Sequence, residues 1–260
     1  GTILAVGARY NDGTGNNAGH VRVHQWDPAL DGGNGDWDQL GGDIDGEDPN
    51  DNSGWSVALS SDGTILAVGA RYNDGINGAD SGHARVYQWS GSSWTPMGGD
   101  IDGEAANDKS GIAVSLSSDG TILAVGATAN TGSGTWAGHV RVYEWSGTSW
   151  TPMGGDIDAE AAGDELGYSV SLSSDGTILA VGAPYNDGSP STLLNDGHVR
   201  VYQYSADSWT PMGGEIDGED GGDSFGWSVS LSSDGTILAV GAPVNDGSGG
   251  TGTDSGHVRV

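Results

Sequence analysis

Carboxylates at a fixed spacing are the first feature of this chain that could do chemistry. The segment Asp102–Glu104 is followed closely by Asp108. Paired carboxylates can act as general acid and general base, as in glycoside hydrolysis. The same pattern recurs at Asp45–Glu47 with Asp51, at Asp158–Glu160 with Asp164, and at Asp217–Glu219 with Asp223. Because nothing sets one copy apart from its siblings, we expect solvated or turn-capping roles and predict no catalytic residue.

A histidine and an arginine two positions apart form a second repeated group. Alternate residues of a strand lie on one face, so the two side chains share a face. Stacked histidines could bind a metal or sense pH. We favour a structural pair. The arginine would contact an aspartate of the adjoining turn and link neighbouring repeat units, and the histidine would form a hydrogen bond with the backbone. The copies are His20 and Arg22, His83 and Arg85, His139 and Arg141, His198 and Arg200, and His257 and Arg259.

Asn-Asp pairs form a third group of candidates. They occur as Asn11-Asp12, Asn73-Asp74, Asn186-Asp187 and Asn245-Asp246. Both residue types tolerate left-handed backbone, so they suit loops. Their oxygen atoms also suit calcium, or a glycan. Calcium is the only cofactor that we consider from the sequence, and no set of metal ligands is assigned.

Three apolar residues lie in polar loops and have no counterpart in the other copies. They are Trp136, Leu193 and Leu194. Unique apolar side chains in such loops are better candidates for partner contacts than repeated ones. Self-packing of each loop is the alternative.

The elements that position these residues come from a repeat. The phrase Gly-Thr-Ile-Leu-Ala-Val-Gly-Ala begins at residues 1, 63, 120, 176 and 235. Each copy predicts four strands, illustrated by residues 55–60, 64–70, 83–89 and 94–101, with a tight Ser-Ser-Asp-Gly turn after the first. Pro96 cannot donate a ladder hydrogen bond, which predicts that the fourth strand lies at the edge of its sheet.

Four-stranded antiparallel units repeating at this length are typical of β-propeller blades. We therefore predict an all-β propeller forming a single repeat domain over residues 1–260; an open β-solenoid or superhelical stack is the alternative. The chain starts at a second strand and ends at a third. We thus expect about five repeats with incomplete terminal blades, in a segment of a longer array.

The pattern around Phe225-Gly226 resembles the FG-GAP repeat of integrin α-subunit propellers. The shared features are the downstream Asp234-Gly235, the Gly241-Ala242-Pro243 motif and the strand that starts at Gly256. The resemblance covers essentially the whole chain and implies a propeller. It also implies a calcium loop between the first two strands. Here that loop is reduced to Ser-Ser-Asp-Gly, which cannot supply the six or more oxygens that calcium needs.

Composition limits the classes of function. With 8 Lys and Arg against 36 Asp and Glu, the net charge is −28, which disfavours nucleic acid as a partner. No apolar run is long enough for a membrane span, so we expect no membrane insertion. We predict a non-enzymatic structural or adhesion protein, extracellular or at the cell surface, that binds a protein partner or assembles with itself. The alternative is a multivalent glycan-binding lectin, whose glycan binding could depend on calcium. A propeller hydrolase is a third, weaker interpretation.

Overall fold

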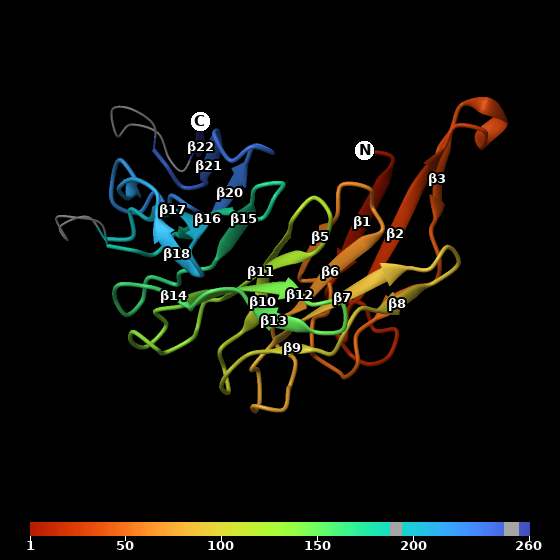
Figure 1. Ribbon diagram of the computed structural model, residues 1–260, viewed down its shortest axis with the longest axis horizontal. Coiled ribbons are helices and arrows are strands. Elements are labelled where there is room, and N and C mark those ends of the chain that lie inside the picture. The colour runs from red at the N-terminus through yellow and green to blue at the C-terminus, as the bar shows by residue number, and fades with distance from the viewer. Residues whose placement is uncertain (188–193, 247–254) are drawn as a thin grey trace.

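Five antiparallel sheets, arranged as the blades of a β-propeller, make up the structure (Figure 1). This computed structural model describes residues 1–187, 194–246 and 255–260. Helix is almost absent from the described residues, where only the short 3-10 helix η1 (Asp31–Gly33) occurs. The prediction of an all-β propeller with incomplete terminal blades is confirmed.

The first sheet contains β1 (Ile3–Ala8), β2 (His20–Asp27), β3 (Asp36–Gln39) and β4 (Ile44–Asp45). The second contains β5 (Ser56–Leu59), β6 (Ile65–Ala70), β7 (His83–Trp89), β8 (Trp94–Pro96) and β9 (Ile101–Asp102). The third contains β10 (Ser110–Leu116), β11 (Ile122–Ala127), β12 (His139–Trp145), β13 (Trp150–Pro152) and β14 (Ile157–Asp158). The fourth contains β15 (Ser169–Leu172), β16 (Ile178–Ala183), β17 (His198–Ser205), β18 (Ser208–Pro211) and β19 (Ile216–Asp217). The fifth contains β20 (Ser228–Leu231), β21 (Leu238–Ala242) and β22 (His257–Arg259).

The predicted fourth strand is divided into two short strands. In the second sheet, β8 and β9 both pair with β7, at opposite ends of that strand. Pro96 ends β8, and the turn that follows contains Gly98 in the left-handed region, at a φ of 89°. The division matters because β9 brings Asp102 opposite His83, at the start of the third strand.

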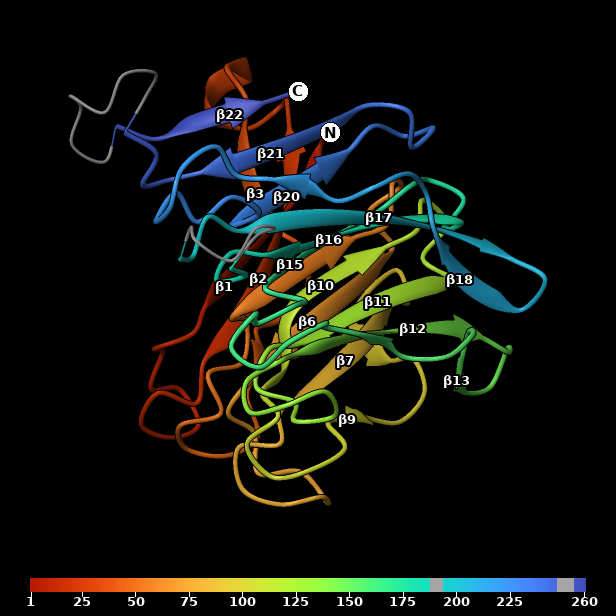
Figure 2. The ribbon, with the colours of Figure 1, turned by 90° about the vertical axis from the view of Figure 1, so that its left-hand side faces the viewer.

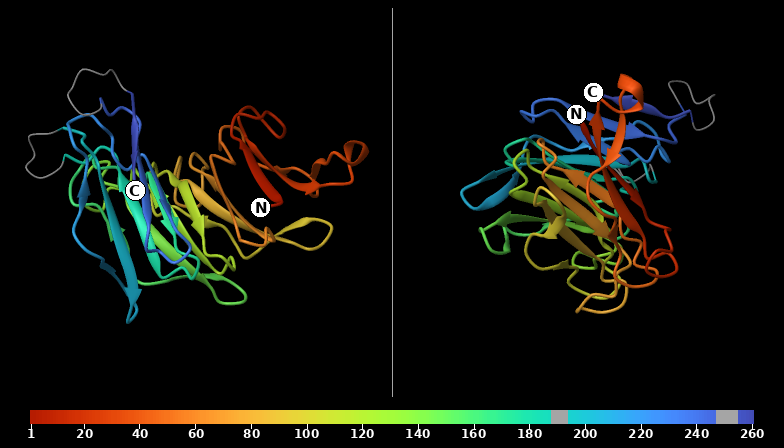
Figure 3. Two further views of the ribbon diagram at one scale, coloured as in Figure 1. Left: turned by 90° about the horizontal axis from the view of Figure 1, so that it is seen from above. Right: turned by 90° about the vertical axis from the view of Figure 1, so that its right-hand side faces the viewer.

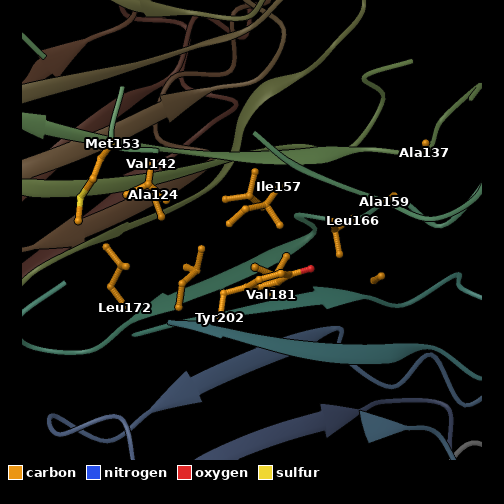
Figure 4. Close-up of a cluster of buried hydrophobic side chains, with 13 residues drawn as sticks. Ala124, Ala137, Val142, Met153, Ile157, Ala159, Leu166, Leu172, Val181 and Tyr202 are labelled. Atoms are coloured by element: carbon orange, nitrogen blue, oxygen red, sulfur yellow. The ribbon is translucent and has the colours of Figure 1, made fainter. Parts of the chain in front are cut away.

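The apolar core lies between the sheets (Figure 4). One cluster joins Val140 and Val142 on β12 to Leu179 and Val181 on β16, together with Leu166 of the segment that connects them. Similar clusters lie between the first and second sheets and between the second and third. Figure 2 shows the fourth sheet stacked over the third. Each of the three inner blades thus buries its second strand between the two neighbouring blades, as the continuous apolar run predicts.

Backbone contacts also join successive blades. The Ser118 amide donates to the Ser174 carbonyl at 2.8 Å, and the Ser174 amide donates to the Ser233 carbonyl at 2.8 Å. Within each of these turns, the aspartate is used locally. Asp119 Oδ1 accepts from Ser117 Oγ at 2.7 Å and from the Thr121 amide at 3.0 Å. The repeated Ser-Ser-Asp-Gly turn therefore closes its hairpin and also links it to the next blade.

The first and last sheets lie at the two ends of the series (Figure 3, left). Leu4 and Val6 on β1 are each 45% exposed, whereas the equivalent Leu66 and Val68 on β6 are 0% and 2% exposed. Ile237, which directly precedes β21, is also exposed, whereas the equivalent Ile65, the first residue of β6, is buried. The second strands of the two outer sheets therefore show side chains that the inner sheets bury.

Candidate functional site

Each repeated arginine contacts carboxylates, and from the second sheet onward one of them belongs to the connection from the preceding sheet. In the third sheet, Arg141 donates to both carboxylate oxygens of Asp156, at 2.9 and 3.0 Å, and also contacts Glu104 of the preceding connection. The Nδ1 atom of His139 lies 3.8 Å from Glu104 Oε2 and 4.0 Å from Asp158 Oδ1. Strand register explains the last contact, because His139 is paired with Asp158 across β12 and β14.

Burial favours the neutral form of the histidines of the second and third sheets. It lowers the pKa of His139, and the nearby Arg141 lowers it further, although Asp156 and Glu104 act in the opposite direction. In the second sheet, burial lowers the pKa of His83 to about 4, and Arg85 adds to this effect. At neutral pH each imidazole therefore has one ring nitrogen with a free lone pair.

Arg141→Ala is expected to lower the free energy of unfolding by about 1–2 kcal/mol, because it removes a partly buried ion pair that joins two blades. Arg22→Ala is the matched control. Arg22 bonds to Asp43 of its own sheet and is more exposed, at 46% against 26% for Arg141. Urea unfolding monitored by tryptophan fluorescence measures both. An Arg141→Ala protein as stable as wild type would contradict a linking role.

The side chains of the Asn-Asp loops form hydrogen bonds with other groups of the chain. Asp12 Oδ1 accepts from the Asn17 amide, Asp74 Oδ1 accepts from the Asp80 amide, and Asp187 Oδ1 accepts from the Asn195 amide. The asparagine side chains serve other partners. Asn11 Oδ1 accepts from the Gly13 amide, Asn73 donates to buried Asp51, and Asn245 donates to buried Asp223. Asn186 is buried and Asp246 is exposed. Calcium or glycan binding at these loops stays a prediction.

The unique loop residues differ in their surroundings. Trp136 is 49% exposed and its ring lies 4.7 Å from Nζ of Lys109. Leu194 is 65% exposed, and its carbonyl accepts from the Gly222 amide. Leu193 lies outside the described residues. Contact of these residues with a partner stays a prediction.

A different group departs from the repeat, and we call it the axial cluster: Arg9, Trp55, Arg71, Tyr72, Lys109, Glu165, Tyr168, Tyr185 and Trp227. It contains all three of the chain's lysines and arginines that lie outside the repeated arginine position. The Trp55 ring lies between two guanidinium groups, whose Cζ atoms are 3.9 Å (Arg9) and 3.7 Å (Arg71) from its centroid. Lys109 lies 5.7 Å from the centroid of Tyr72.

The other half of the axial cluster is aromatic and contains one acid. Tyr168 lies 4.6 Å from Trp227 and 6.2 Å from Tyr185, measured between ring centroids. Burial raises the pKa of Glu165, while the charges of Lys109 and Arg71 partly offset this. Burial, with Tyr185 and Glu165, also raises the pKa of Tyr168 to about 12, although Arg71 and Arg9 act against it. These interactions connect residues beside all five sheets.

Local backbone explains how Lys109 and Glu165 reach this place. They occupy equivalent positions in successive copies, two residues before Gly111 and Gly167, where the chain enters the first strand of a blade. Both adopt left-handed backbone, at φ values of 59° and 52°. The equivalent Asn52 and Ser224 share this conformation, at φ values of 58° and 54°, so the left-handed backbone belongs to the repeat. The first strands are innermost, so side chains at their entry from different blades meet at one end of the propeller axis.

The sequence analysis missed the axial cluster. The lysine and arginines outside the repeated position entered it only as part of the total charge. The signal was available, because a lysine and a glutamate replace the asparagine and serine that stand at the same position in other copies, Asn52 and Ser224. The Nε atom of Arg71 is buried and, among the described residues, has no hydrogen-bond partner. Arg71 thus keeps one N–H donor that no hydrogen bond among the described residues uses.

Blade number, strand order and inter-blade packing define this protein as a β-propeller. Residues 45–87, 158–202 and 217–260 match the FG-GAP repeat family, and together they make up half of the chain. The chain belongs to that family. No curated protein matches the sequence.

Two solved structures illustrate the similarity of fold. The periplasmic gluconolactonase of Pseudomonas aeruginosa is 17% identical, with a TM-score of 0.57, and the match covers 92% of this chain and 61% of that one. A proposed 6-phosphogluconolactonase from Bacteroides uniformis is 10% identical, with a TM-score of 0.57, over 95% of this chain and 63% of that one. At these identities the likeness shows the fold alone. The chain spans about three fifths of the length of these structures.

These findings correct the prediction of a non-enzymatic structural or adhesion protein. The structures with the same propeller fold are named as lactonases, which are enzymes. The FG-GAP pattern identifies the fold and carries no evidence for adhesion. The error arose because we took repetition to exclude a reactive centre, although the axial cluster breaks the repeat. No helix in the described part of the chain is long and apolar enough to cross a membrane.

Proposed function

We propose that this chain provides the substrate site of a lactonase-type hydrolase that opens a sugar lactone bearing an anionic group. One observation carries the proposal: the cations outside the repeated arginine position gather around a single carboxylate and several aromatic rings. The lactonase names of the structural neighbours support the class of reaction. One neighbour is periplasmic by name, which supports work outside the cytoplasm; fractionation of the source cells tests that location.

The charge of the axial cluster favours an anionic substrate. Arg9, Arg71 and Lys109 contribute three positive charges in a chain whose net charge is −28. Burial raises the pKa of Glu165, and the charges of Lys109 and Arg71 partly offset this rise. The fully charged protein repels anions at long range, so local cations are needed to hold one. Trp227 is 40% exposed beside Tyr168 and offers a flat apolar surface to a sugar ring.

Glu165 acts as the general base in the proposed reaction. Its carboxylate accepts a proton from water as the water oxygen bonds to the lactone carbonyl carbon. Arg71 and Lys109, whose charges act on Glu165, stabilise the negative charge that develops on the carbonyl oxygen. The bond between the carbonyl carbon and the ring oxygen then breaks, and the protonated Glu165 returns its proton to that oxygen. The product is a hydroxy acid, and every proton is accounted for.

The direct test is an assay of proton release at constant pH with gluconolactone and with its 6-phosphate as substrates. We expect a saturable rate above the spontaneous hydrolysis of each lactone, and a lower KM for the phosphorylated substrate. A rate equal to the buffer blank for both lactones would contradict the proposal.

The pH dependence of this reaction should move when Lys109 is replaced. Hydrolysis needs ionised Glu165, so the rate should rise with pH through the raised pKa of that group. Lys109 lowers the pKa of Glu165, and its removal therefore raises it. In Lys109→Met the acid limb of the kcat/KM profile should shift to higher pH. Arg200→Met, at a repeated position away from Glu165, is the control. A limb that stays in place, or moves to lower pH, would exclude Glu165 as the base.

A further inference from the structure

We propose that the repeated histidine–carboxylate clusters between the blades are binding sites for a divalent transition-metal ion such as Zn²⁺. The four clusters are His20 with Asp43 and Asp45, His83 with Glu47 and Asp100, His139 with Glu104 and Asp156, and His198 with Glu215 and Asp217. In each, one potential ligand atom per residue lies within 4.8 Å of the others. The histidines of these clusters stand at the start of β2, β7, β12 and β17, whereas the residues of the axial cluster precede the first strands or follow the second strands.

The fourth sheet shows that the ring nitrogen lacks a partner. His198 is 2% exposed, and its Nδ1 atom has no hydrogen-bond partner among the described residues. Asp217 Oδ1, in the same cluster, is also buried and without a hydrogen bond. A buried donor or acceptor without a partner destabilises the fold, so two of them in one cluster favour a ligand between them.

The spacing in the other clusters fits a shared ion better than a direct hydrogen bond. His139 Nδ1 lies 3.8 and 4.0 Å from the nearest carboxylate oxygens, and His20 Nδ1 lies 3.7 and 4.0 Å from its own. Hydrogen bonds of this kind are shorter than about 3.2 Å. Zinc holds nitrogen and oxygen ligands at about 2.0–2.2 Å, which places two tetrahedral ligands roughly 3.4 Å apart. Small side-chain movements would therefore complete such a site.

The arginine in each cluster leaves ligands available. Arg141 takes both oxygens of Asp156 and one oxygen of Glu104. The second oxygen of Glu104 and a carboxylate oxygen of Asp158 still face the imidazole. Three carboxylates against one guanidinium leave about two negative charges, which a divalent ion would neutralise. Asp158 is 50% exposed, so the ion can enter from solvent.

The ligand types select the class of metal. Imidazole nitrogen favours zinc, copper, iron or nickel, whereas calcium prefers six to eight oxygen atoms. The clusters thus differ from the Asn-Asp loops, where calcium was considered, in both residues and metal.

The test is calorimetric titration of chelator-treated protein with Zn²⁺ in a background of millimolar Ca²⁺, which occupies the acidic surface. We expect about four ions per wild-type chain and about three for Asp158→Asn, an exposed position that keeps the fold. His139→Gln should also bind about three. The control His24→Gln removes the sixth histidine, which lies outside the clusters, and should bind four.

Two results would overturn the proposal. Ca²⁺ suppressing all uptake of Zn²⁺ would show only a general affinity of the acidic surface. Equal numbers of zinc ions in wild type, Asp158→Asn and His139→Gln would place the metal elsewhere. The visible absorption of bound Co²⁺ gives an independent readout, because it should lose about a quarter of its intensity in both cluster variants and none in His24→Gln.

Discussion

Glu165→Gln is expected to lower kcat for lactone hydrolysis by at least about 10²-fold, because general base catalysis typically contributes 10²–10⁴-fold. Glutamine keeps the size of the side chain and removes its ability to accept the proton of water. Burial raises the pKa of Glu165, the one carboxylic acid of the axial cluster, which brings it closer to neutral pH than the pKa of an exposed glutamate. The same constant-pH assay measures kcat and KM.

The KM of the Glu165→Gln protein should stay close to wild type or fall, because removal of the one acid leaves Arg9, Arg71 and Lys109 to bind the anionic substrate. Glu144→Gln is the matched control, because Glu144 is an exposed acid on β12 that faces away from the core. It should retain wild-type kcat. A Glu165→Gln protein with unchanged kcat would show that this carboxylate does not act in hydrolysis, whatever binds at the cluster.

Much of the fold could be predicted because each copy repeats the same local rules. The run Ile65–Ala70 is apolar on both faces, and the structure buries every residue of it between two sheets. Pro96 placed the fourth strand at the edge, where β8 lies. The division of that strand into β8 and β9 was not predicted, since two residues of β9 are too few to give a periodic signal.

The candidate site could not be predicted in the same way. Strand pairing places His139 opposite Asp158, which follows from the register of a single blade. The axial cluster depends on how separate blades converge, and Arg9 and Tyr168 lie far apart in the chain. Repetition drew attention to residues that recur. In a symmetric fold, a site for one substrate is made by residues that break the repeat, as Lys109 and Glu165 do.

Gly126→Ala is expected to be strongly destabilising, with a loss of about 3 kcal/mol or more of unfolding free energy. A Cβ atom at Gly126 would lie 2.0 Å from the carbonyl oxygen of Gly167 in the next blade. That neighbour is backbone, so it cannot rotate away as a side chain would. The blades would have to separate at the apolar cluster between the third and fourth sheets, which exposes core side chains such as Val142 and Val181.

Gly241→Ala provides the matched control, because Gly241 is the equivalent residue of the fifth sheet. The nearest atom to its added Cβ would be Ser228 Oγ, at 2.5 Å, which belongs to a side chain of its own sheet. Its loss should therefore be smaller, about 1 kcal/mol or less. Urea unfolding by circular dichroism compares the two. Equal losses would show that the cost comes from alanine in the strand itself. A larger loss for Gly126 would show that the approach of two glycine backbones sets the spacing of the blades, and thereby the distance across which Arg9, Arg71, Lys109 and Glu165 interact.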